Sequence, residues 1–171
     1  MDGSDFDVNA LYDALDVRRA ERGITWTELT RELNDLFRDV TAARPIARST
    51  VTGMRDKSGM NGNGIIQMLV WLRRAPESFC PDWPVPGKLF PPSPADRILR
   101  WNGPGIYEAL NSRRELRELS WKQVADEIGF WFSPTNLRAL QKTHGLAFPW
   151  GMRLFRWLGE PAADHVVATP W

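Results

Sequence analysis

The most constraining feature of this chain is an internal repeat. Residues 12–34 return as residues 107–129 at a constant offset of 95, so that Trp26 is matched by Trp121. Beyond these segments the copies realign at an offset of 86, and the first repeat therefore carries nine more residues (95 − 86 = 9) between its second and third periodic segments. Each repeat is long enough to close a small core, which predicts two domains of one type rather than a solenoid.

The expected organisation is a first domain at residues 1–80, with a long insertion between its second and third helices, and a second domain at residues 98–171. Residues 81–97 between them include PDWPVPGKLFPPSP, whose prolines predict a semi-stiff linker rather than a helix. At about 3.1 Å per residue, such a stretch reaches roughly 40 Å, comparable with one turn of B-DNA at about 34 Å. The alternative is that the segment lies on a domain surface through its apolar residues, Trp83, Leu89 and Phe90.

Composition narrows the class of protein. The chain is 43% hydrophobic and 25% charged, and it has no apolar run near the 18 residues that predict a membrane span. No signal peptide is evident, so the sequence predicts a cytoplasmic protein, associated with a bacterial nucleoid if it binds DNA. The lone Cys80 cannot form an internal disulfide, and with only His144 and His165 beside it the sequence predicts no metal site and no cofactor.

The charge balance argues mildly against a nucleic-acid partner. The net charge is +1, made up of −1 over residues 1–80 (11 Lys/Arg, 12 Asp/Glu) and +2 over residues 81–171 (11 Lys/Arg, 9 Asp/Glu). Nucleic-acid binders are commonly more basic than this. DNA binding therefore requires a local concentration of positive charge.

Apolar periodicity predicts four short helices in each repeat and an all-α fold. The second helix of each repeat begins at a capping box, since Thr25 and Ser120 are each followed three residues later by Glu or Gln. We expect Gly129 to end the second helix of the second repeat in a left-handed conformation. The third helix of each repeat is expected to bury one apolar pair, Val51/Met54 in the first repeat and Leu137/Leu140 in the second. The fourth helix is expected at residues 64–74 and 151–159.

The string LSWKQVADEIGFWFSPTNLRALQKT resembles the helix-turn-helix of the lambda repressor and Cro-like (Xre) family. That resemblance implies two tandem four- to five-helix DNA-binding domains, with a short helix that carries a small residue, a turn at Gly and a recognition helix that enters the major groove. It extends over about residues 10–80 and 105–166, and more particularly to small bacterial members that read "SW..VA.EIG...S...L" and end in "RWLG". The matching positions are Ser120, Ala125, Gly129, Ser133, Leu137 and Leu140.

The chain departs from the family at four places. Phe130 and Trp131 lengthen the turn of the second repeat, residues 35–45 lengthen that of the first, and Thr30 replaces the small Ala. Trp26 and Trp121 occupy a position where many relatives carry a Gln that meets DNA phosphate. An indole N–H can also donate to phosphate; the alternative is that both residues anchor the core against Trp71 and Trp157 of the fourth helix.

The resemblance and the helical period together nominate DNA-contacting residues. Arg and Gln are well shaped for bidentate contacts to guanine and adenine edges, and helix N-termini with nearby cations suit phosphate. The base-contact candidates are Arg48, Ser49, Thr52, Arg55, Ser133, Thr135, Arg138 and Gln141. The phosphate-contact candidates are Thr25, Trp26, Lys57, Arg113, Arg114, Ser120, Trp121, Lys122 and Lys142. For the arginines of the first helix, the alternative is pairing with carboxylates of their own helix.

The sequence predicts no enzyme. The carboxylate pairs Asp13/Asp16 and Asp126/Glu127 lack His partners and read as surface, and His144 is expected to cap the end of the recognition helix. The leading expectation is a sequence-specific double-stranded DNA-binding transcriptional regulator that reads an asymmetric two-part site. The alternative is a helical protein-interaction module, adaptor or antitoxin-like, that has lost DNA binding. Pairing with itself or with a protein partner is expected through the fourth helix, the linker or the tail HVVATPW.

Overall fold

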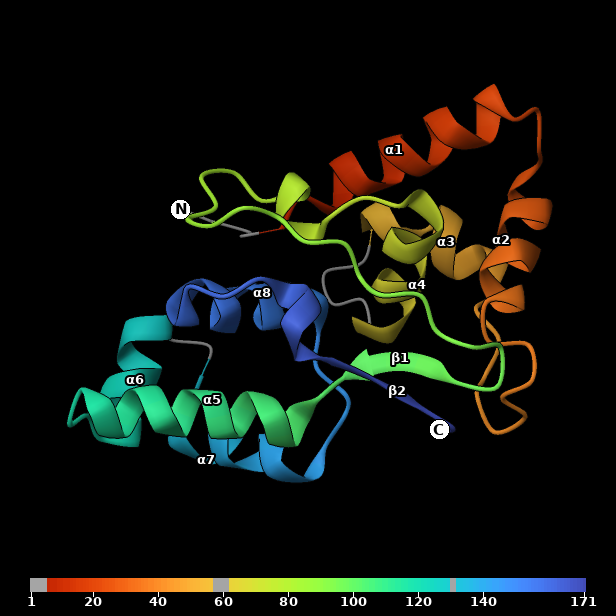
Figure 1. Cartoon of the computed structure of the whole chain (residues 1–171). Coiled ribbons are helices and arrows are strands. Elements are labelled where there is room, and N and C mark those ends of the chain that lie inside the picture. The colour runs from red at the N-terminus through yellow and green to blue at the C-terminus, as the bar shows by residue number, and fades with distance from the viewer. Residues whose placement is uncertain (1–5, 57–61, 130–131) are drawn as a thin grey trace.

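The structure, a computed structural model, describes residues 6–56, 62–129 and 132–171, and it is mainly helical (Figure 1). The first repeat contains α1 (Val8–Glu21), α2 (Trp26–Asp35), α3 (Arg48–Thr52), the 3-10 turn η1 (Met54–Asp56), α4 (Gly62–Leu72) and the 3-10 turn η2 (Pro76–Phe79). The second repeat has the same order: α5 (Gly103–Leu116), α6 (Trp121–Ile128), α7 (Pro134–Ala139), η3 (Leu140–Lys142), α8 (Phe148–Leu158) and η4 (Ala162–His165). The predicted four helices per repeat are confirmed.

The second helix of each repeat begins where the capping boxes predict. In α2, Glu28 N–H donates to the Thr25 hydroxyl (3.2 Å), and the Glu28 carboxylate accepts from Thr25 N–H (2.7 Å). In α6, Ser120 and Gln123 make the same reciprocal pair at 3.2 and 2.8 Å. These contacts satisfy two backbone donors that a helix start leaves open, and they are local in sequence.

Gly129 ends α6, but not in the predicted left-handed helical conformation. Its φ is 139° and its ψ is 161°, an extended backbone with positive φ that is open mainly to glycine. Its N–H still donates to the carbonyl of Ala125 (3.0 Å). The chain therefore leaves α6 extended instead of curling back over the end of the helix.

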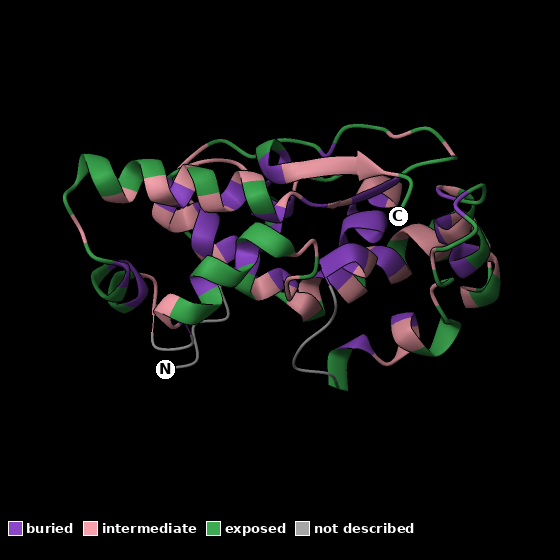
Figure 2. Cartoon of the chain, turned by 90° about the horizontal axis from the view of Figure 1, so that it is seen from below, coloured by how far each residue is buried: buried purple, intermediate pink, exposed green. Residues whose placement is uncertain are grey.

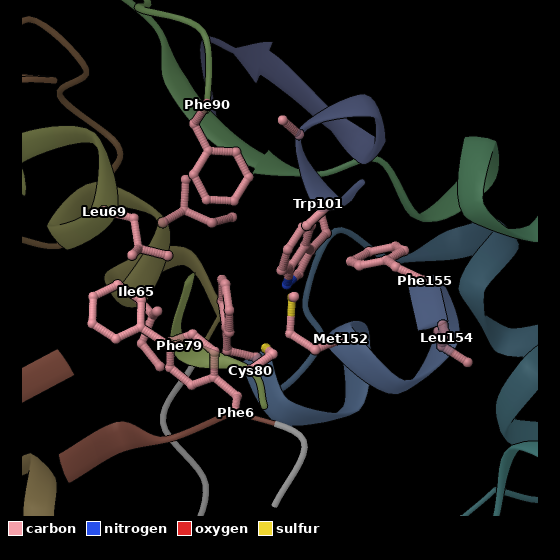
Figure 3. Packing of buried hydrophobic residues seen from close by; sticks show 14 of the residues in the cluster. Phe6, Ile65, Leu69, Phe79, Cys80, Phe90, Trp101, Met152, Leu154 and Phe155 are labelled. Atoms are coloured by element: carbon pink, nitrogen blue, oxygen red, sulfur yellow. The ribbon is translucent and has the colours of Figure 1, made fainter. Parts of the chain in front are cut away.

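The two repeats share one hydrophobic cluster instead of closing separate cores, which corrects the expectation from the sequence. Phe6 of the first repeat packs on Phe148 of the second, with ring centroids 4.6 Å apart, and Phe148 packs on Trp101 at 5.1 Å. Figure 3 shows Ile65 and Met152 approaching the same region from α4 and α8. Figure 2 shows the buried residues gathered between the helices and the exposed residues on their outer faces.

The helix α4 is covered by elements from both halves of the chain. Eight of its eleven residues are buried, which is typical of a helix covered on several sides rather than on one stripe. Two of the flanking elements, α8 and β1, belong to the second half of the chain. The fourth helices, which the sequence nominated for pairing with another molecule, are thus largely used within this one.

Residues 81–97 lead from η2 into the strand β1 (Ile98–Trp101), which pairs antiparallel with β2 (Val166–Thr169), so the fold is mainly helical with a small two-stranded sheet rather than all-α. Phe90 is buried beside Trp101, at a centroid distance of 6.1 Å, so this segment lies on the core. The sequence nominated the C-terminal tail for pairing with another molecule. Residues Val166 to Thr169 of that tail instead form β2, which pairs with β1 of the same chain.

Buried polar groups tie the halves together. The Glu77 carboxylate, 5% exposed, accepts from the backbone N–H of Ala162 (2.7 Å) and of Lys88 (3.2 Å). The Gln67 amide on α4 donates to the carbonyl of Leu99 on β1 (3.0 Å). Because unsatisfied buried polar groups are costly, these bonds favour one arrangement of the repeats.

The insertion of the first repeat is folded. Phe37 and Val40 are buried against Ile98 in a small second cluster. The Asn34 amide clips the insertion to α2, since it donates to the carbonyl of Ile46 (3.0 Å) and accepts from the Ile46 N–H (2.7 Å). The insertion thus forms a fixed wall beside α2 and α3.

Candidate nucleic-acid interface

The helix pair that resembles a helix-turn-helix packs as the sequence predicts. Ala125 of α6 is buried, and Leu137 and Leu140 turn inward with 0% and 4% exposure. In the first repeat, Thr30 replaces the alanine and is also buried. Its hydroxyl is satisfied there because it donates to the carbonyl of Trp26 (2.7 Å). The predicted buried pairs are confirmed, Val51 and Met54 included.

The outward surface of α7 and η3 is here called the α7 face, and it consists of Thr135, Arg138, Gln141 and Lys142. All four are exposed, and none has a hydrogen bond or ion pair with another described side chain. Ser133, another base-contact candidate, is instead the N-cap of α7, where its hydroxyl accepts from Asn136 N–H (3.1 Å). The α7 face is therefore a row of unused donors on a segment anchored by two leucines.

The corresponding α3 face consists of Arg48, Ser49, Thr52 and Arg55, and it is less available. The side chains of Arg48 and Ser49 are exposed and form no hydrogen bond or ion pair with another described side chain. The Thr52 hydroxyl donates to the carbonyl of Arg48 (3.1 Å). Arg55 forms an ion pair with Asp13 and lies 4.3 Å from the ring centroid of Tyr12.

The helix starts nominated for phosphate differ in charge. At α2, the hydrogen bonds that Glu28 accepts from Thr25 lower the pKa of the Glu28 carboxyl, so this end carries a fixed negative charge. At α6 the same position holds the neutral Gln123, and Lys122 lies beside it, paired with Asp126 at 2.7 Å. Since a negative charge repels phosphate, the start of α6 is better suited to a DNA backbone.

The arginines of the first helices make contacts within their own repeat. Arg113 donates to the carbonyl of Leu158 (2.5 Å), as Arg18 does to Leu72 (3.0 Å). Arg114 donates to the carbonyl of Leu119 (2.9 Å) and lies over the Trp121 ring at 5.1 Å. We therefore leave Arg113 and Arg114 out of the DNA-contacting set. The alternative of pairing with a carboxylate of the same helix holds for Arg114, which pairs with Glu115 (3.3 Å), whereas Arg113 contacts a carbonyl of α8 instead.

Trp26 and Trp121 pack on the core, and each stacks on a tyrosine of the first helix of its own repeat. Trp121 is 9% exposed and stacks on Tyr107, with centroids 5.2 Å apart and planes at 23°. Trp26 stacks on Tyr12 in the same way, at 5.2 Å and 28°. Each stacked pair joins the first helix of a repeat to its second helix, which favours the core-anchor alternative over contact with phosphate.

A duplicated ion-pair cluster was missed at the level of sequence. Arg117 makes a two-pronged bond to Glu127 (2.6 and 3.0 Å), and the Trp157 indole donates to the same carboxylate (2.8 Å). Both bonds lower the pKa of the Glu127 carboxyl. The first repeat has the same cluster, formed by Arg22, Glu32 and Trp71. The offset of 95 would have revealed the Arg and Glu members, which are identical in both repeats.

Two further predictions concern Lys57, a phosphate-contact candidate, and His144, the expected cap of the recognition helix. Lys57 lies outside the described residues. The His144 ring nitrogen Nδ1 lies 2.9 Å from the carbonyl oxygen of Trp101, so His144 contacts the end of β1 rather than capping the recognition helix.

Comparisons with protein-family models, with curated proteins and with solved structures find no match to this chain. Over the described ranges, none of the helices is long and apolar enough to cross a membrane. In the same part of the chain, no group of three or more His, Cys, Asp or Glu side chains is placed to hold a metal ion. The geometry of the α7 and α3 faces is therefore what supports a function.

Proposed function

We propose that the protein is a sequence-specific, double-stranded DNA-binding transcriptional regulator of the lambda repressor and Cro-like type. The observation that carries this proposal is the α7 face, with an arginine, a glutamine and a lysine exposed and unpaired on a segment whose inner side is anchored by Leu137 and Leu140. Arg138 and Gln141 have the donor geometry that reads base edges in a major groove. Lys142 and the start of α6 supply the phosphate contacts that fix the register.

The first repeat contributes a weaker, non-identical reading surface. At the matched positions of the third helices, Arg48 stands against Pro134 and Thr52 against Arg138. Arg55 is neutralised by Asp13, and Glu28 places a carboxylate at the start of α2. The protein therefore prefers an asymmetric site in which the second repeat supplies most of the discrimination.

A protein-interaction module is the second candidate, and the first repeat favours it. Its α3 face has one arginine already paired, and its cap is acidic, so this repeat is poorly suited to a polyanion. This alternative includes a protein with divided roles, in which the second repeat binds DNA and the first repeat binds a protein partner.

Selection of bound duplexes from a random library tests the proposal, and Arg138→Ala sharpens it. We expect this variant to lose about 1–3 kcal/mol of discrimination at one base position and to leave other positions unchanged. Arg97→Ala, which removes an exposed arginine from the 81–97 segment, is the matched control and should behave as the parent.

Two outcomes contradict direct reading by the α7 face. One is a selection that yields no preferred sequence. The other is an Arg138→Ala variant that weakens all duplexes equally. Binding that does not fall steeply with rising salt argues for the protein-interaction module, because a protein that neutralises phosphates releases counterions.

A further inference from the structure

The first repeat contains an open groove with a volume of about 430 Å³. It lies between α2, the insertion at residues 36–47 and the first residue of α3. We call it the arginine groove, and its lining residues are Thr27, Thr30, Arg31, Asn34, Asp35, Phe37, Arg38, Val40, Ala43, Pro45 and Arg48. Its volume falls in the range of sites for small molecules, about 300–1,000 Å³.

The wall of the arginine groove is fixed and partly apolar. Phe37 and Val40 are 4% and 6% exposed and are held by the second hydrophobic cluster. The Asn34 clip to Ile46 holds the end of the insertion, and the Asp39 N–H donates to the carbonyl of Ala95 (2.9 Å). A groove formed in advance does not have to be ordered when a ligand binds, which favours affinity.

The polar lining is positively charged. Arg31, Arg38 and Arg48 face a single lining carboxylate, Asp35. The guanidinium groups of Arg31 and Arg48 form no hydrogen bond or ion pair with another described side chain, although Arg31 attracts the Glu28 and Glu32 carboxylates of its own helix. Arg38 has only a 4.0 Å contact with the exposed Asp39. Three guanidinium groups with unused donors beside an apolar wall are complementary to an anion with an apolar body.

The sequence of the second repeat does not supply the residues that line this groove. It lacks the nine extra residues, and Asp126 stands at the position of Arg31. That Asp126 pairs with Lys122, and Gly129 replaces the Asn34 that clips the insertion. The arginine groove is thus a property of the first repeat and not of the shared helical framework.

We propose that the arginine groove binds a small organic anion. The apolar part of the ligand lies against the wall lined by Phe37, Val40, Ala43 and Pro45, and its carboxylate, sulfonate or phosphate group is bound by Arg31, Arg38 and Arg48. A DNA backbone would contact the arginines and leave the apolar wall of the groove exposed to water. A small amphipathic anion contacts both the arginines and the apolar wall.

Arg48 belongs both to the arginine groove and to the α3 face. If the proposed DNA-binding function holds, on which this step rests, a bound anion competes with DNA for this guanidinium. Each ligand then weakens the other by the same factor, because the coupling between two binding sites is reciprocal.

Isothermal titration calorimetry of the full chain with naphthalene-2-carboxylate, without DNA, tests the site. We expect one-site binding that is at least about tenfold weaker for the neutral naphthalene-2-carboxamide, and at least about tenfold weaker for inorganic phosphate, which lacks the apolar part. Arg38→Ala should weaken the carboxylate about tenfold, while Arg44→Ala, which removes an exposed arginine of the same insertion that does not line the groove, should leave it unchanged. Thermal melting checks that both variants are folded, and Ala43→Phe, which fills the groove, should also reduce binding.

Equal binding of the acid and the amide overturns the proposal, and so does equal weakening by Arg38→Ala and Arg44→Ala. Failure of the carboxylate to bind, together with a loss of random-duplex affinity in Arg38→Ala, assigns the groove to the DNA backbone and also overturns it. The calorimetry contains no DNA, so its outcome is independent of the proposed regulator function. Competition is measured separately by adding the carboxylate to the selected duplex complex.

Discussion

The first and second repeats have the same internal framework and different outer surfaces. In both, the arginine that caps the end of the first helix, a glutamate of the second and a tryptophan of the fourth form one cluster. Outside this framework, the start of the second helix is acidic at Glu28 and neutral at Gln123. The comparison indicates that the contacts that hold the helices together are retained in both copies, while the surfaces proposed to bind a ligand differ.

The fourth helices differ most sharply at their first residues. Phe148 begins α8 and packs on Trp101, whereas the matched residue Gly62 begins α4, where an added Cβ would lie 2.2 Å from the Trp101 indole nitrogen and 2.4 Å from the Leu146 carbonyl oxygen. The Phe148 ring of the second repeat thus packs beside Trp101, whereas at Gly62 of the first repeat Trp101 and Leu146 leave no room for a side chain. The starts of the two fourth helices are therefore complementary within the one shared core.

The largest expected effect comes from breaking this complementarity. Phe148→Ala removes a fully buried ring at the junction and should lower the free energy of unfolding by about 3–5 kcal/mol. Because the cluster spans both repeats, we expect a single denaturant transition and a loss of hydrogen-exchange protection in α1 and α5 alike. Leu116→Ala, at a position 85% exposed, is the control and should change stability by less than about 0.5 kcal/mol. Loss of protection confined to the second repeat would mean that the repeats unfold separately.

The features that could be predicted from sequence are those set by neighbouring residues. The capping boxes at Thr25 and Ser120 and the buried pair Leu137/Leu140 depend on spacings of three residues. The pairing of β1 with β2 could not be predicted, because it joins segments about 68 residues apart (166 − 98 = 68) whose short apolar runs do not specify a partner. For the same reason the arginine groove was missed, since it requires the folded position of the insertion.

The pH dependence of stability provides a second comparison, between His165 of η4 and the matched Phe79 of η2. His165 is 6% exposed and stacks on Phe155, with centroids 4.6 Å apart. Its Nε2 lies 2.8 Å from a carboxylate oxygen of Glu160, without hydrogen-bond geometry. Burial lowers the pKa of the imidazole below 6.5, and this effect exceeds the opposing effects of Glu160 and Asp164.

Because the folded-state pKa of His165 is lowered, the unfolded chain takes up the proton first as the pH falls below about 6.5. The free energy of unfolding should therefore have its full value above that pH. It should fall as the pH decreases from about 6.5 toward the folded-state pKa of His165. His165→Phe, the residue of the first repeat, should flatten this slope in urea titrations at about pH 7.5 and about pH 5.5. An unchanged slope in a variant that is stable at the higher pH would assign the dependence to other groups.

The smallest expected effect concerns the caps of the two second helices. Glu28→Gln removes the carboxylate at the start of α2 and keeps the capping oxygen, so random-duplex affinity at low salt should rise by about two- to fivefold. The reverse exchange, Gln123→Glu, places a negative charge at the start of α6 and should lower the affinity by a similar factor. Fluorescence anisotropy across a salt series measures both, and the differences should shrink as salt screens the charges. If only the exchange at α6 changes affinity, phosphate contacts belong to the second repeat alone, whereas no change in either variant would exclude both helix starts from the interface.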